Sequence, residues 1–242
     1  MAITTAAQAR EVLGATGGGT SPARGEEIYD FVLEHGFESC LELGFAHGVG
    51  SVYIAAALEK NGKGHLTGVD NLSARERDPS AQDLVDKAGL TDRVTYVYEE
   101  TSYNWFLHDT LRKQLADGAI EPLYDFVFID GAHTWEADAL AFELVDRLLK
   151  PGGWILLDDL DWTLDERWPD VPQYQKDIPQ IRAVWELLAL TNPQYDRFET
   201  EGQWGWMRKS AEANPATRTV VKRDLVGSVR EVGRLARRKL RR

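Results

Sequence analysis

Two apolar runs of this 242-residue sequence end in carboxylates, which are the first candidates for chemistry. Asp130 follows YDFVFI (124–129), while Asp158 and Asp159 follow WILL (154–157). If the runs are neighbouring parallel strands, the three carboxylates meet at one edge of a sheet. Close carboxylates raise one another's pKa, and a hard divalent cation, magnesium first, would relieve their repulsion. The alternative is that these aspartates cap the following helices or are simply solvated.

His133 lies three residues after Asp130, where a helix is expected to begin. It could take the proton of a hydroxyl group as a general base, although a lone histidine can equally be a structural hydrogen-bond partner. Asp161 is a further carboxylate that could bind an ion or a substrate. The segment 161–175 is expected to cover the site, and its aromatic side chains could stack on a sugar or phenolic ring or pack against protein. These aromatic residues are Trp162, Trp168 and Tyr174.

A glycine-rich loop follows an earlier apolar run, CLELGF (40–45). The candidate residues of this run and its loop are Glu42, which lies inside the run, and Gly44, Gly48 and Ser51. Glycines let a backbone turn sharply and approach a ligand, and the helix that follows offers free N–H groups. Asp70 ends the next run and suits the hydroxyls of a ribose. The spacing Gly-x-x-x-Gly-x-Gly disfavours a dinucleotide, and the absence of a Gly-Lys-Ser/Thr sequence excludes a P-loop.

Apolar runs alternate with helical patterns along most of the chain. Strands are expected at 40–45, 65–70, 93–99, 124–130 and 154–160, and helices at 22–36, 49–58, 81–90, 103–115, 134–149 and 181–190. The helix 134–149 has an apolar stripe of Ala137, Leu140, Ala141, Leu144, Val145 and Leu148,. This order predicts an α/β fold: a doubly wound, mostly parallel Rossmann-like sheet with helices on both faces. YDRFET (195–200) and QWGWMRK (203–209) predict a C-terminal antiparallel hairpin,.

Four segments in this order resemble the class I S-adenosylmethionine-dependent methyltransferases. They are LELGFAHGVGS (41–51), TGVD (67–70), YDFVFIDGAHTWEA (124–137) and LLKPGGWILLDD (148–159). The resemblance implies that the glycine loop holds the methionine and ribose parts of the cofactor and that Asp70 holds the ribose hydroxyls. Residues 100–102 occupy the place that usually meets the adenine. The implied cofactor-binding residues are Glu42, Gly44, Gly48, Ser51, Asp70, Thr101, Ser102 and Asp130.

The aspartates resemble those of the metal-dependent O-methyltransferases, of the catechol type and of the macrolide and aminocoumarin sugar type. In that family an Asp after the fourth strand, and an Asp followed by Asp or Asn after the fifth, bind magnesium. The 28-residue step from Asp130 to Asp158 matches this pattern, which implies Asp130, Asp158 and Asp159 as metal ligands. His133 stands where the catechol type has a lysine base, and Ala132 where sugar-type relatives can have an acidic one. The resemblance thus implies His133 as the catalytic base.

Charge is unevenly spread along the chain. The net charge is −11, but ten Lys or Arg and two Asp or Glu give residues 218–242 a net charge of +8, which leaves −19 for 1–217. Such an acidic body argues against nucleic acid as its partner. One cysteine, no apolar run of membrane length and no apolar signal region at the start predict a soluble cytoplasmic protein,.

Three segments are expected: an N-terminal helical segment (1–38), an S-adenosylmethionine-binding methyltransferase domain (39–210) and a basic amphipathic tail (211–242). The tail could dock on the acidic body of its own or another subunit, lie on an anionic membrane or contact nucleic acid. Docking or a loosely ordered tail is favoured over membrane contact, and a homo-oligomer is open.

The predicted function is an O-methyltransferase that uses S-adenosylmethionine, with magnesium and His133 as general base. Its acceptor would be a hydroxyl of a small molecule, a sugar or a phenolic or polyketide natural product. One alternative is a metal-independent methyltransferase in which His133 alone activates the acceptor. The other is a non-catalytic cofactor-binding regulatory or scaffold subunit recruited through the basic tail.

Overall fold

A computed structural model describes residues 1–16, 20–165 and 168–212 of the chain. Its centre is one seven-stranded sheet with the order β3-β2-β1-β4-β5-β7-β6. Strands β1 to β5 run parallel, and β7 pairs antiparallel with β5 and β6. The strands are β1 (Ser39–Leu43), β2 (His65–Asn71), β3 (Val94–Glu99), β4 (Tyr124–Ile129), β5 (Leu149–Leu157), β6 (Tyr195–Glu201) and β7 (Trp204–Lys209). This sheet confirms the predicted Rossmann-like fold and its C-terminal hairpin.

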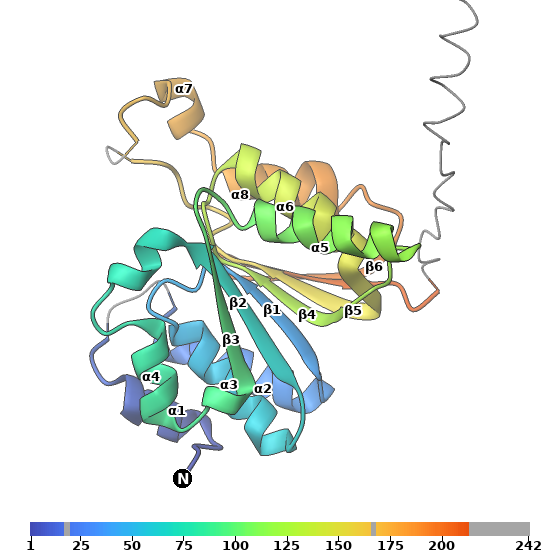
Figure 1. Ribbon diagram of the computed structural model, residues 1–242. Coiled ribbons are helices and arrows are strands. Elements are labelled where there is room, and N and C mark those ends of the chain that lie inside the picture. The colour runs from blue at the N-terminus through green and yellow to red at the C-terminus, as the bar shows by residue number, and fades with distance from the viewer. Residues whose placement is uncertain (17–19, 166–167, 213–242) are drawn as a thin grey trace, which may run out of the picture.

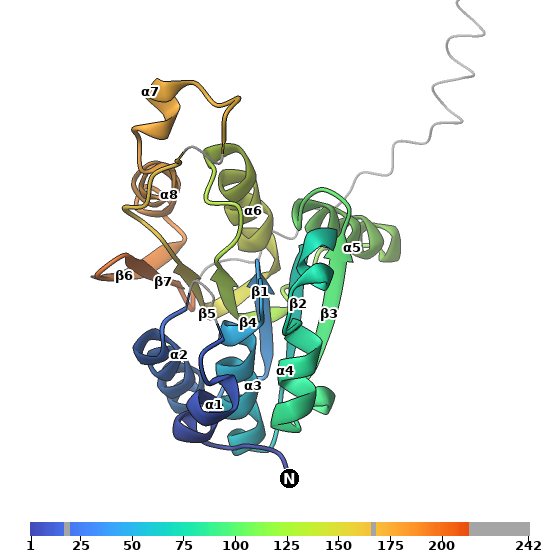
Figure 2. The same ribbon diagram turned by 90° about the vertical axis from the view of Figure 1, so that its left-hand side faces the viewer.

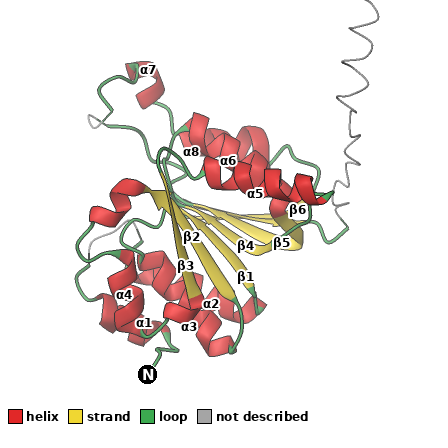
Figure 3. Ribbon diagram, in the orientation of Figure 1, coloured by secondary structure: helices red, strands yellow, loops and turns green. Residues whose placement is uncertain are grey.

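Helices cover both faces of the sheet, with α1 to α4 on one face and α5, α6 and α8 on the other (Figures 1 and 3). The helices are α1 (Ala6–Leu13), α2 (Pro22–His35), α3 (Val49–Asn61), α4 (Ala81–Ala88), α5 (Asn104–Asp117), α6 (Trp135–Leu148), α7 (Gln173–Lys176) and α8 (Gln180–Val184). Short 3-10 turns lie at Leu72–Glu76 and Thr91–Arg93. In the three described ranges, no helix has the length and apolar character needed to cross a bilayer. Most of the predicted tail, from residue 213 onward, lies outside the described residues, so its role stays a prediction.

The central strands β1, β4 and β5 are largely buried on both faces, and this explains their continuous apolar sequences. Successive side chains of a strand point to opposite faces. In β4, Phe126 and Phe128 pack in the cluster beneath α1 to α4, whereas Val127 and Ile129 pack in the cluster beneath α5 and α6. The register pairs Ile129 with Leu43 of β1 and with Leu157 of β5. The residues that follow these strands therefore emerge at the same level of one sheet edge.

Helix α6 buries a slightly different face from the predicted one. Phe142, which is absent from the predicted stripe, is fully buried, whereas Leu140 is 48% exposed beside a groove between α5 and α6. The helix packs against α5 and α8 as well as against the sheet, so its buried face is turned away from Leu140.

The segment after β5 also differs in detail from the prediction. The helix predicted at 181–190 begins as α8 and continues as a π-helical turn, Trp185–Ala189. Within the predicted loop 161–177, Gln173–Lys176 forms α7, which projects from the sheet beyond α8 in Figure 2. The local hydrophobic pattern of the sequence does not contain the information needed to predict the π-helical turn or α7.

The observed face of α6 can be tested by two truncations on the same helix. Phe142→Ala is expected to lower the free energy of unfolding by about 3–5 kcal/mol, because it opens a cavity in the core. Leu140→Ala, the matched control, should change it by only about 0.5 kcal/mol. Urea unfolding of both variants measures the difference. Equal losses would contradict the orientation of α6.

Candidate functional site

The loops after β1, β2, β3 and β4 surround a cavity of about 410 Å³. In open α/β sheets, ligands bind at this edge, beyond the carboxyl ends of the strands. The predicted site residues that line the cavity are Gly44, Asp70, Thr101, Ser102, Asp130 and His133. Asn71, Arg77 and Tyr103 also line it and were not predicted. Tyr103 directly precedes α5, and nothing in the apolar pattern of that helix marks it.

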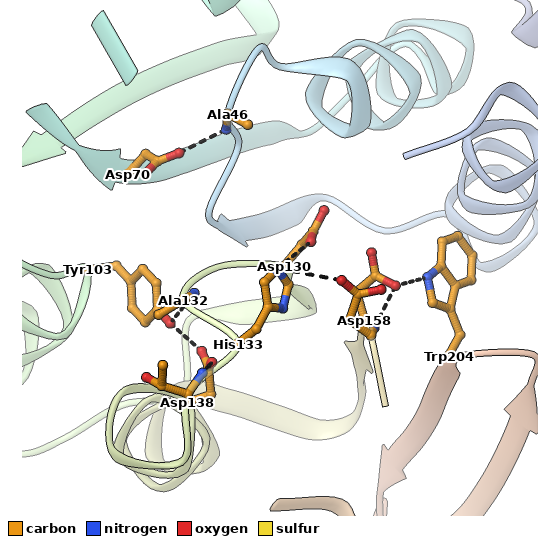
Figure 4. Close-up of polar contacts among 11 residues, drawn as sticks. Ala46, Asp70, Tyr103, Asp130, Ala132, His133, Asp138, Asp158 and Trp204 are labelled. Carbon is orange, nitrogen blue, oxygen red and sulfur yellow. Dashed lines mark hydrogen bonds and ion pairs between the residues drawn. The ribbon is translucent and has the colours of Figure 1, made fainter. Parts of the chain in front are cut away.

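Gly44 and Asp70 connect the loops after β1 and β2 to the neighbouring backbone at this sheet edge. The φ of Gly44 is +88°, and a Cβ atom there would lie 2.3 Å from the carbonyl oxygen of Asp130, so only glycine fits,. Asp70 accepts hydrogen bonds from the backbone N–H groups of Ala46 at 2.8 Å and Asn71 at 2.7 Å (Figure 4 shows the first). Since each carboxylate oxygen can accept more than one bond, Asp70 can still bind hydroxyl groups.

Glu42, Gly48 and Ser51 lie beneath the glycine loop and do not line the cavity. Glu42 is 1% exposed and accepts a hydrogen bond from the hydroxyl of Ser51, in the first turn of α3. Burial raises the pKa of Glu42 to about 8,. Gly48 precedes α3 with a φ of +82°. These three residues support the loop, and their predicted contact with the cofactor stays a prediction.

Asp130, Asp158 and Asp159 lie together beside the cavity. Because Ile129 pairs with Leu157, the two aspartates that follow, Asp130 and Asp158, are side by side (Figure 4). Burial, and then the charge of Asp158, raises the pKa of Asp130 well above its usual range. Burial and the charge of Asp159 raise the pKa of Asp158 to about 6,.

His133 lies between two of these carboxylates. Its Nε2 is 3.6 Å from Asp130 Oδ1 and 3.8 Å from Asp159 Oδ2. The ring of Trp162 packs edge-on against the imidazole, with 5.3 Å between the ring centroids. The predicted base is thus placed next to the cavity, with a carboxyl group on each side of the nitrogen that would carry a proton.

Trp204 is a site residue that sequence reasoning missed. Its Nε1 donates a hydrogen bond to Asp158 Oδ1 at 2.6 Å, and the backbone N–H of Asp159 donates to the same oxygen at 2.7 Å. The guanidinium of Arg24 lies over the Trp204 ring, 4.3 Å from its centroid, as a cation–π contact,. The predicted hairpin contained this tryptophan, but only the pairing of Leu157 with Gly205 brings it to Asp158.

The predicted magnesium ligands are close together without forming a coordination sphere. Over residues 1–16, 20–165 and 168–212, no three His, Cys, Asp or Glu side chains surround one point as metal ligands would. One reason is that Trp204 binds an oxygen of Asp158; the other is that His133 lies between Asp130 and Asp159. The donor chemistry nevertheless fits a hard cation, because a cation would relieve the repulsion that raises the carboxyl pKa values.

The segment after β5 brings two of its three predicted aromatic residues to the site. Trp162 contacts His133, and Trp168 lies 5.5 Å from Trp162 between ring centroids. Tyr174, by contrast, is 66% exposed. Asp161, predicted as a spare ligand, forms an ion pair with Arg182 at 2.6 Å. The two tryptophans are thus the surfaces on which an acceptor ring could stack.

Comparisons with known proteins agree with this architecture. Residues 41–160 match the family model described as a methyltransferase domain. An O-methyltransferase from Bacillus cereus, solved with S-adenosylhomocysteine (SAH), has a TM-score of 0.57 at 21% identity, over 84% of this chain and 89% of that one. The O-methyltransferase TomG from Streptomyces achromogenes, involved in tomaymycin synthesis, gives 0.60 at 20% over 85% and 87%.

A third solved structure, an SAH-bound methyltransferase from Podospora anserina, gives a TM-score of 0.63 at 15% identity over 85% of this chain and 87% of that one. At such low identity, these likenesses show the fold. A search of curated proteins finds no match.

The buried state of Glu42 has a testable consequence for stability. Its pKa of about 8 in the folded protein exceeds its usual value of 4.5, so the folded state holds a proton that the unfolded chain releases between these pH values,. This group therefore lowers the free energy of unfolding as the pH rises from about 4.5 to about 8, by on the order of a few kcal/mol. Glu42→Gln should remove that loss, since the amide carries no charge.

Urea unfolding of the parent protein and Glu42→Gln at pH 5 and pH 8 measures this effect. Comparing the two proteins cancels the contributions of the other titrating groups. If both lose the same stability between the two pH values, Glu42 is not a buried, protonated group.

Proposed function

This chain belongs to the methyltransferase-domain family, and we propose that it is an S-adenosylmethionine-dependent O-methyltransferase acting on a hydroxyl of a small molecule. The observation that carries the proposal is the position of His133 and three aspartates directly beside the cavity. Trp162 next to His133, with Trp168 beside it, favours an acceptor with a ring, a sugar or a phenolic or polyketide natural product,.

The cavity residues divide into groups for the cofactor and a group for the acceptor. Asp70 would accept the ribose hydroxyls, and Gly44, which packs against the backbone of Asp130 and Gly131, would face the cofactor with backbone alone. Thr101 and Ser102 follow β3, where the adenine would lie. When bound, S-adenosylmethionine supplies an electrophilic methyl group. The acceptor would approach from the side of His133 and Trp162.

His133 would act as the general base. Transfer of the methyl group from sulfur to the acceptor oxygen breaks the S–CH₃ bond, forms an O–CH₃ bond and releases the hydroxyl proton. The Nε2 atom of His133 would take this proton. The imidazolium then lies 3.6 Å from Asp130 and 3.8 Å from Asp159, and both carboxylates stabilise its charge,. Magnesium held by Asp130, Asp158 and Asp159 would polarise the acceptor hydroxyl.

A metal-independent reaction is the second candidate, and one observation favours it. Neutral His133 can take the acceptor's proton at Nε2, which lies between Asp130 and Asp159, so the imidazolium that forms is stabilised there without an ion. In this alternative the same base acts on the acceptor alone.

Calorimetric titration with SAH, with and without magnesium, tests the central proposal. We expect SAH to bind in both conditions, since Asp70, Thr101 and Ser102, which are assigned to the cofactor, are not among the proposed metal ligands. Asp70→Ala should weaken it by about tenfold or more, because two ribose hydrogen bonds to a charged group are lost. If SAH gives no heat with magnesium and none without it, the proposed cofactor is excluded. Binding without methyl transfer to any catechol or glycoside would favour the scaffold alternative.

Removal of the proposed metal separates the two catalytic candidates. With the catechol or glycoside that the parent methylates fastest, Asp158→Ala and chelation with EDTA should each reduce the rate by about 100-fold or more if magnesium is used. Asp161→Ala is the matched control, since Asp161 pairs with Arg182 outside the carboxylate group. A parent protein that keeps its full rate in EDTA would instead support His133 acting alone.

A further inference from the structure

His133 has a backbone conformation that its own side chain does not favour. Its φ is +53°, in the left-handed region that residues other than glycine enter only at a cost in free energy,. Such a conformation persists only where the surrounding structure holds it. The fold must therefore contain groups that hold the loop between Asp130 and the start of α6.

Two buried side chains bind this loop by its backbone (Figure 4). The hydroxyl of Tyr103 accepts a hydrogen bond from the N–H of Ala132 at 3.2 Å and donates one to Asp138 Oδ1. Asp138 Oδ2 accepts from the N–H of Thr134 at 3.0 Å. One Tyr–Asp pair thus binds the N–H groups of Ala132 and Thr134, the residues on either side of His133.

The pair is shielded from water and its members come from two different elements. Tyr103 directly precedes α5, and Asp138 lies in the first turn of α6; both are buried. Burial raises the pKa of Tyr103 well above its ordinary value and the pKa of Asp138 to about 6,. At neutral pH the phenol is therefore the donor and the carboxylate the acceptor. The ring also packs closely on Gly131, where a Cβ atom would lie 2.3 Å from Tyr103 Cε1.

We propose that Tyr103 and Asp138 are positioning residues that hold the His133 imidazole in place for proton transfer, an inference that rests on the base role proposed above. Asp138 does not line the cavity. Tyr103 borders it, but its hydroxyl is bound to Asp138 and to the backbone. Both residues would thus affect the reaction through the loop. Without the hydroxyl, the loop could relax and carry Nε2 of His133 away from Asp130.

A purely structural role is the competing explanation, because any buried Tyr–Asp hydrogen bond stabilises a fold. The chain offers a matched control for it. Tyr195 is also buried and donates a hydrogen bond to Asp146 at 3.0 Å, near the opposite end of α6. Tyr195→Phe therefore removes the same kind of bond on the same helix, at a distance from the His133 loop.

The test compares Tyr103→Phe, Asp138→Asn and Tyr195→Phe in the full chain. The first readout needs no acceptor: it is the ¹H–¹³C NMR signal of the His133 ring, one of five histidines, assigned by its loss in His133→Ala. The second is methyl transfer to catechol as the probe acceptor. SAH affinity and thermal unfolding show whether each variant is folded.

We expect Tyr103→Phe and Asp138→Asn to shift the His133 ring signal, with SAH affinity unchanged, and Tyr195→Phe to leave that signal in place. Transfer to catechol should fall about 10- to 100-fold in the first two variants, because a small misplacement of a catalytic group has an effect of this size. In a His133→Ala background, Tyr103→Phe should cause no further loss. Asp138→Asn keeps the test valid if Tyr103→Phe does not fold.

An unchanged His133 signal in both variants would overturn the proposal, as would an equal loss of rate in Tyr195→Phe or a further loss in the His133→Ala background. These results differ from a failure of the proposed function itself. In that case His133→Ala would keep the parental rate, and the positioning role would fall with the base.

Discussion

The repulsion among buried carboxylates at one sheet edge is the constraint on which this site depends. The parallel register pairs Leu43 with Ile129 and Ile129 with Leu157, so the chain cannot place Asp130 and Asp158 apart without changing the sheet. Burial removes the water that would otherwise screen them. The fold therefore has to supply positive charge, protons or hydrogen-bond donors at this point. Carboxylates that are stable only with such partners can also bind a cation or stabilise a positively charged side chain.

The partners that the protein supplies come from elements far apart in the sequence. Trp204, from the hairpin, donates to Asp158, and Arg24, from α2, lies over its ring. On the other side of the site, Tyr103 and Asp138 bind the loop that carries His133. Asp158 and the loop that carries His133 are thus each held by buried neighbours. Such an arrangement keeps catalytic groups within the narrow tolerances that proton transfer requires.

The sequence was sufficient for the sheet and for the residues at its edge, but not for their partners. Continuous apolar runs marked the parallel strands because both faces are covered, and Asp130 and Asp158 could be placed together because parallel strands end at a common edge. Trp204 could not, since its contact with Asp158 depends on how a distant hairpin pairs with β5. The same limit explains why the exposure of Leu140 and the burial of Phe142 were not predicted. Helices α5 and α8, as well as the sheet, decide which face of α6 is buried.

The site also joins two halves of the fold with different chemistry. The loops after β1 to β3 line the cavity with backbone, hydroxyl-bearing residues, Asn71, Arg77 and a single acidic residue, Asp70. The loops after β4 and β5 concentrate negative charge around His133. The halves meet where Gly44 lies against the carbonyl of Asp130, with no room for a side chain. A larger residue there would push the loop after β1 away from Asp130, so this close contact fixes how near the two halves of the site lie.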